Sequence, residues 1–103
     1  MPSIEELEKL VTQFPTKPFP RYGLAMEYKK AGRHDEALAH FREAIKLDPN
    51  YTAAFFHGGM SCEAAGRPED AKAFYRDGLA AANRIGNGHA ASEIGAALAA
   101  LGG

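Results

Sequence analysis

An internal repeat of 34 residues is the feature that most constrains how this chain of 103 residues can fold. When the sequence is shifted by 34 positions, Ala31-Gly32-Arg33 falls on Ala65-Gly66-Arg67. A fixed period of this length is typical of repeat architectures, in which each unit packs against its neighbours. The sequence therefore predicts a single domain over 1–103 that contains two copies, 18–51 and 52–85. Other identical pairs at this offset are Met26 with Met60, Ala37 with Ala71, and Arg42 with Arg76.

Each copy has the pattern of two helices joined by a tight turn. Pro20 suits a first helical turn, because the N–H that proline lacks would have no partner there. Gly32 and Gly66 favour helix ends, since glycine readily adopts the left-handed conformation of a C-terminal cap. Asp48-Pro49-Asn50 is expected to end the second helix of the first copy, because proline cannot continue a helix. Gly86-Asn87-Gly88 is expected to end the corresponding helix of the second copy.

Two more helices are expected outside the copies. Ser3 and Glu6 have the spacing of a capping box, which predicts a helix over 3–14. The alanine-rich segment 88–101 predicts a C-terminal capping helix. An all-α fold of about six helices follows. The expected apolar faces of the two flanking helices carry Ile4, Leu7, Val11 and Phe14, and Ile94, Leu98 and Leu101.

Charge and cysteine content narrow the class of protein. Twelve Lys and Arg face thirteen Asp and Glu, so no basic excess suggests a nucleic-acid partner. The single cysteine, Cys62, cannot form an intramolecular disulfide, which favours a reducing compartment. The N-terminus lacks the pattern of a signal peptide, and no apolar run has the length of a membrane span. A cytoplasmic protein that binds neither membranes nor nucleic acid is expected.

Six residues of the first copy fall in a distinctive order. Small residues alternate with large ones at helical spacing, and a proline closes the unit; these are Leu24, Ala25, Tyr28, Ala37, Phe41 and Pro49. The pattern resembles that of the tetratricopeptide repeat (TPR) family, although Arg21 stands where the family carries a large apolar residue. The second copy supplies Phe55, Gly59, Ala71 and Tyr75, and departs from the family pattern at Gly58, Cys62 and Asn83.

The resemblance implies antiparallel helix hairpins stacked into a short right-handed superhelix. It also implies that the first helix of each hairpin lines a concave groove that binds a peptide or helix of a partner protein. Aromatic and methionine side chains would suit such a groove, because they offer large and adaptable apolar surfaces. The expected groove residues are Phe19, Tyr22, Met26, Lys29, Phe56, Met60 and Glu63, with His57 at the edge.

Some family members hold acidic C-termini of chaperones with Lys and Asn side chains. This chain has Tyr22, Met26 and His57 at the corresponding positions, so that activity is not expected. No residues have the spacing of a catalytic, cofactor or metal site; Cys62 replaces a core tyrosine and is expected to be a buried thiol.

Two alternatives remain open from the sequence. The groove could be covered by the protein's own helix, for instance by the apolar face between Ile4 and Phe14, because large exposed apolar patches are unusual on monomers. The chain could instead self-associate as a homo-oligomer. In that case Ile94, Leu98 and Leu101 are the expected contact, with small alanines around them.

Overall fold

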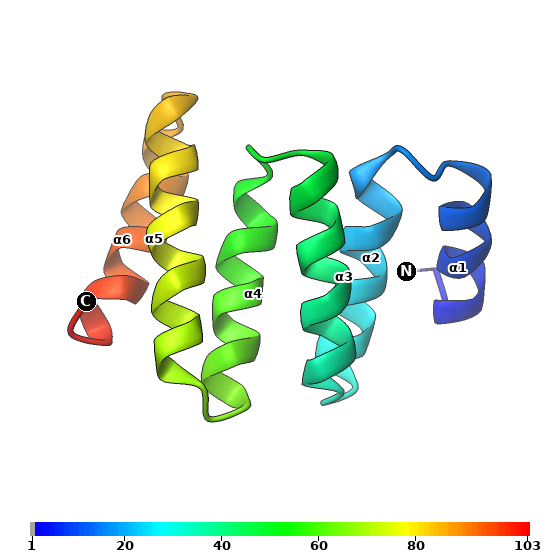
Figure 1. Ribbon diagram of the computed structural model, residues 1–103, viewed down its shortest axis with the longest axis horizontal. Coiled ribbons are helices and arrows are strands. Elements are labelled where there is room, and N and C mark those ends of the chain that lie inside the picture. The colour runs from blue at the N-terminus through cyan, green and yellow to red at the C-terminus, as the bar shows by residue number, and fades with distance from the viewer. Residues whose placement is uncertain (1) are drawn as a thin grey trace.

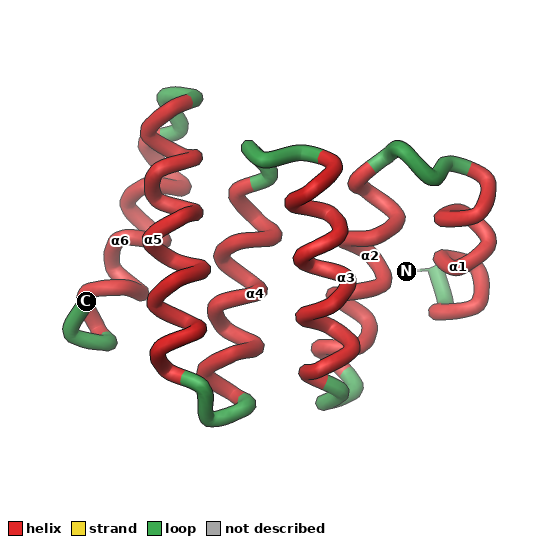
Figure 2. Tube along the Cα trace, in the orientation of Figure 1, coloured by secondary structure: helices red, strands yellow, loops and turns green. Residues whose placement is uncertain are grey.

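The computed structural model describes residues 2–103 and folds into six α-helices joined by short turns (Figures 1 and 2). The prediction of an all-α chain with six helices is confirmed. Within residues 2–103, no helix is both long and apolar enough to cross a membrane. The helices are α1 (Ile4–Gln13), α2 (Pro18–Lys30), α3 (His34–Leu47), α4 (Thr52–Ala64), α5 (Pro68–Arg84) and α6 (Gly88–Ala100).

The helix ends follow local signals in the sequence. At the start of α1, the Glu6 N–H donates to Ser3 Oγ at 3.1 Å, and the Ser3 N–H donates to Glu6 Oε1 at 3.2 Å, which completes the predicted capping box. After α2 and α4, Gly32 and Gly66 have φ values of 77° and 73°. Because a side chain is strained in this left-handed region, glycine suits both turns.

The turn after α5 differs in part from the expectation. Gly86 stops α5 with a φ of 69°, but the next two residues start a helix instead of ending one. Asn87 is the N-cap of α6, where its side chain accepts a hydrogen bond from the Ala90 N–H at 3.0 Å. Gly88 is the first residue of α6. Asparagine is a favoured N-cap because its oxygen satisfies an amide that has no partner within the helix.

Each helix packs mainly on its neighbours in the chain. The helices α2 and α3 form one antiparallel hairpin and α4 and α5 form the next, while α1 packs on α2 and α6 on α5. In Figure 1, α3 and α5 lie toward the viewer, and α2 and α6 lie behind them. The helix α4 also contacts α2 and α6, so these three helices lie in one layer. The fold therefore has one layer that contains α2, α4 and α6, and another that contains α3 and α5.

The core consists of two adjoining clusters, one toward each end of the molecule. The first includes Leu7, Leu24 and Phe41, and the second includes Phe55, Tyr75 and Ile94; Ile45 packs against both. Leu98 is also buried in the second cluster. The packing of α6 on the preceding hairpin therefore buries the side chains of Ile94 and Leu98 within the chain. Because they are buried, the expectation that they form a contact between two copies of the chain is wrong for these residues.

Contacts across the second hairpin account for two glycines of that copy. A Cβ atom on Gly58 would lie 2.6 Å from Cε1 of Phe74, and one on Gly59 would lie 2.2 Å from Cε1 of Tyr75. Both distances are far below van der Waals contact, so the rings of α5 lie directly on the backbone of α4. The departure from the family pattern at Gly58 therefore matches the position of the Phe74 ring.

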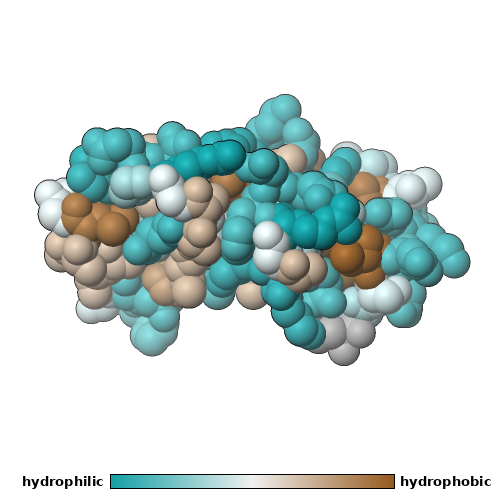
Figure 3. Space-filling view, turned by 90° about the horizontal axis from the view of Figure 1, so that it is seen from below, coloured by the Kyte–Doolittle hydropathy of each residue, from teal (hydrophilic) through white to brown (hydrophobic). Residues whose placement is uncertain are grey.

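Seen from the end that holds the α2–α3 and α4–α5 turns, the surface is hydrophilic in its middle part, with apolar patches toward both sides of the view (Figure 3). Arg67 pairs with Asp35 at 2.7 Å, which links the two turns, and Arg33 pairs with Glu36 at 2.5 Å. Exposed ion pairs such as these contribute little stability. Their main consequence is that the two turns carry charge at this end.

Candidate functional site

The residues expected to line a groove come from α2 and α4, which pack against each other. Four of them form a contact cluster, which we call the α2–α4 cluster: Tyr22 and Lys29 on α2, and His57 and Met60 on α4. Lys29 Nζ lies 3.0 Å from His57 Nδ1 and 3.8 Å from Met60 Sδ. The rings of Tyr22 and His57 meet edge to face, with centroids 6.2 Å apart. His57 therefore lies between the two helices, and not at the edge of the surface.

The cluster holds one hydrogen bond whose direction is fixed by chemistry. An ammonium group has donors only, so Lys29 donates and His57 Nδ1 accepts, which requires a neutral imidazole. Burial, and secondly the Lys29 charge, lower the pKa of His57, while Glu93 of α6 partly offsets these effects. Burial also lowers the pKa of Lys29. The half-buried cluster thus combines a lysine cation with neutral aromatic and thioether groups.

Two more of the expected residues, Phe56 and Glu63, join α4 to α5. The Phe56 ring lies 5.3 Å from that of His57 and 6.3 Å from that of Tyr75. Glu63 accepts a hydrogen bond from the Tyr75 hydroxyl. Burial, and then this bond, raise the pKa of Tyr75, because ionisation would place a second negative charge beside the carboxylate. Glu63 is consequently held against the core, although its side chain is exposed overall.

The remaining expected residues differ in exposure. Met26 is partly buried against the first core cluster. Phe19 is 59% exposed in the first turn of α2, whereas Met60 is 37% exposed within the α2–α4 cluster. The structure therefore brings together the central residues of the predicted set and leaves Phe19 apart from them.

Sequence reasoning missed two contributors to this surface. Tyr51 directly precedes α4, and its ring lies 5.0 Å from that of Tyr22. Glu93 comes from α6 and acts on His57. Tyr51 could have been found from its place at the start of a predicted helix. Glu93 could not, because the path of α6 over α4 depends on packing between helices distant in the chain.

The other candidate chemistry gives no site. In the described part of the chain, no three His, Cys, Asp or Glu side chains gather in a way that could hold a metal ion. Cys62 is buried, and burial raises the pKa of its thiol, which disfavours the reactive thiolate.

Comparison with known proteins agrees with this architecture. A model of the tetratricopeptide repeat matches residues 20–51, which cover most of α2 and all of α3. A TPR repeat-containing protein of Pseudomonas aeruginosa is 32% identical over 91 residues, which cover 88% of this chain and 87% of that protein. The chain belongs to the tetratricopeptide repeat family.

Solved structures extend the likeness to the whole TPR fold. The crystal structure of a TPR domain protein from Salinibacter ruber has 34% identity and a TM-score of 0.74, and the match covers 82% of this chain and 94% of that one. The solution structure of a protein from Bordetella parapertussis has 28% identity and a TM-score of 0.83, with 99% of this chain and 89% of that one covered. TPR domains are in general modules of protein–protein interaction.

Proposed function

We propose that this TPR protein binds a peptide or helix of a partner protein on the surface formed by α2 and α4. We infer that 18–51 and 52–85 are its two repeats, that it acts as a non-catalytic adaptor, and that it works in the cytoplasm. The observation that carries the proposal is the α2–α4 cluster, where Tyr22, Lys29, His57 and Met60 meet on a half-exposed surface. Such a surface combines an apolar contact area with a cation and hydrogen-bonding groups.

The packing of α1 supports an accessible surface over one covered by the chain's own helix. Within residues 2–103, α1 packs on α2 alone and does not contact α4. Leu7 of α1 inserts toward Gly23, where a Cβ would lie 2.8 Å from Leu7 Cδ2. The apolar face of α1 is therefore directed at the core beside α2, which leaves Met60 of α4 partly exposed.

Selection of peptides from a displayed random library against the whole chain tests this function. Peptides that bind the wild type are measured again with Met60→Glu and with the control Ala39→Glu, which changes an exposed residue of α3. We expect Met60→Glu to weaken binding at least about tenfold, because it places a charge in an apolar contact, and Ala39→Glu to have no effect. Equal binding by all three proteins, or a library that yields no binder, would contradict the proposal.

Homo-oligomerisation predicts a different outcome. If a second copy occupied the surface, sedimentation of the wild type would show dimers whose population rises with concentration and falls in Met60→Glu. A monomer at all concentrations, together with peptide binding that depends on Met60, supports the adaptor function.

A further inference from the structure

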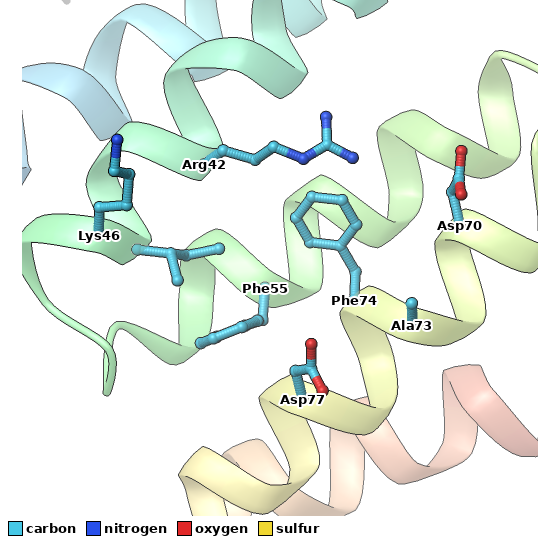
Figure 4. Close-up of a pocket in the computed structure, with 8 residues that line it drawn as sticks. Arg42, Lys46, Phe55, Asp70, Ala73, Phe74 and Asp77 are labelled. Carbon is cyan, nitrogen blue, oxygen red and sulfur yellow. The ribbon is translucent and has the colours of Figure 1, made fainter.

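A cavity of about 390 Å³ lies between α3 and α5, and Figure 4 draws the residues that line it. These two helices form the layer away from α2 and α6 (Figure 1). Both helices pack on α4, whereas in the described residues the backbones of α3 and α5 do not approach each other closely, and the Arg42 side chain of α3 reaches Phe74 of α5. The floor of the cavity is apolar and consists of Ile45, Phe55 and Phe74. We call this feature the α3–α5 cleft. It shares no residue with the α2–α4 cluster.

The walls of the α3–α5 cleft carry opposite charges. Arg42 and Lys46 lie one turn apart on α3, and Asp70 and Asp77 lie two turns apart on α5. In Figure 4 the Arg42 side chain reaches over the Phe74 ring, and the Asp77 carboxylate points into the space between the helices. The cleft therefore has a basic wall, an acidic wall and an aromatic floor.

These charges are not neutralised by one another. The Arg42 guanidinium lies 5.2 Å from the centroid of the Phe74 ring, which is a cation–π contact. Among residues 2–103, Arg42, Asp70 and Asp77 take part in no ion pair, and Lys46 pairs only with Glu43 of its own helix, at 3.5 Å. Opposite charges that face each other across an apolar gap, without pairing, are complementary to an occupant that carries both signs.

We propose that the α3–α5 cleft is a second docking site, which takes a helix of a partner protein. That helix places one aromatic side chain on the Phe55 and Phe74 rings, an acidic residue toward Arg42 and Lys46, and a basic residue toward Asp70 and Asp77. The two flanking helices form a trough in which a third helix can lie, a common mode of peptide recognition. The volume suits one large side chain, and the ring edges and faces favour an aromatic one.

The absence of tryptophan from this chain allows a direct test with synthetic helical peptides. Each probe has a central Trp, whose fluorescence reports burial. The first has Glu along one edge and Lys along the other, the second has Lys on both edges, and the third has Glu on both edges. We expect the wild type to bind the mixed peptide about tenfold more tightly than the others, because each single-sign peptide is repelled by one wall.

Variants that reverse the charge of one wall test the inference more sharply than variants that only remove the charge. In Arg42→Glu/Lys46→Glu both walls are acidic, so the preference should change to the peptide with Lys on both edges. In Asp70→Lys/Asp77→Lys both walls are basic, and the peptide with Glu on both edges should bind best. All four positions are at least partly exposed charged sites on helices, and circular dichroism verifies that each variant folds.

Met60→Glu separates the two surfaces, because it alters the α2–α4 cluster only: if the α3–α5 cleft binds the peptides, their order of affinity should be the same in Met60→Glu as in the wild type. A failure of the α2–α4 surface to bind peptides therefore does not affect this test. The inference is overturned if the three peptides bind the wild type equally or not at all, or if preference does not follow the reversed charges. It is also overturned if sedimentation shows a dimer that Arg42→Glu/Lys46→Glu abolishes, since the occupant would then be a second copy.

Discussion

Two glycines inside helices should respond in opposite ways to the same substitution. Gly59 of α4 and Gly95 of α6 both lie away from the helix ends. In a helix interior, Gly→Ala stabilises by about 1 kcal/mol when space is available, because alanine restricts the unfolded backbone. At Gly95 the added Cβ would have its nearest neighbour at 3.9 Å, Cδ1 of Leu79, which is ordinary contact. We therefore expect Gly95→Ala to gain most of that stabilisation.

At Gly59 the same methyl group has no room. It would lie 2.2 Å from Cε1 and 2.6 Å from Cδ1 and Cζ of Tyr75. Tyr75 is fully buried, at 0% exposure, and its hydroxyl is bonded to Glu63, so the ring cannot move away without loss of packing. Overpacking of this kind costs about 1–3 kcal/mol. Because this cost opposes a gain of about 1 kcal/mol, we expect Gly59→Ala to lower the free energy of unfolding by up to about 2 kcal/mol.

Urea and thermal unfolding, followed by circular dichroism, measure both changes. For a domain of this size, 1 kcal/mol corresponds to a shift in Tm of about 4–8 °C. Gly95→Ala should raise Tm by up to that amount, and Gly59→Ala should lower Tm by up to about twice as much. If the two variants shift Tm in the same direction with an unchanged m-value, the close packing of Tyr75 on α4 is refuted.

Three further changes test separate parts of the molecule. Burial lowers the pKa of His57 below its ordinary value of 6.5, so below that pH the unfolded chain binds more protons than the folded one. The free energy of unfolding should therefore fall as the pH drops from 7 to 5. Denaturation of His57→Gln should show a smaller fall. Ser61 is fully buried, and among residues 2–103 its Oγ has no hydrogen-bond partner, so Ser61→Ala should leave Tm unchanged or raise it, whereas a large decrease would reveal a hidden hydrogen bond. Asn87→Ala removes the N-cap of α6 and should cost about 1 kcal/mol in urea unfolding; a loss below a few tenths would show that the cap is unimportant.

Local signals in the sequence predicted the helices well, because their ends depend on neighbouring residues. Ser3 with Glu6, and the glycines at 32 and 66, act through the backbone of their own turns. The exception at Asn87 has the same origin. Asparagine occurs both just after helix ends and at N-caps. In this chain the Asn87 side chain accepts a hydrogen bond from the Ala90 N–H, so Asn87 caps α6.

The surfaces were harder to predict, because they depend on contacts between helices. The spacing placed Tyr22, His57 and Met60 on one surface but did not reveal that Lys29 bonds to His57. The α3–α5 cleft was not predicted at all. It arises because α3 and α5 pack on α4 from either side while their backbones stay apart, and no property of either helix alone indicates that separation.

The sequential packing of the helices also shapes how the chain folds and opens. Because each helix rests mainly on those beside it, few contacts close long loops, and folding should be fast for a chain of this length. Opening can begin at the N-terminal end, since α1 can leave α2 without disturbing the α4–α5 hairpin. Amide protons of α1 should then exchange with solvent through partial opening, ahead of those in α4. A partner held on α4 would therefore rest on the part of the molecule that opens last.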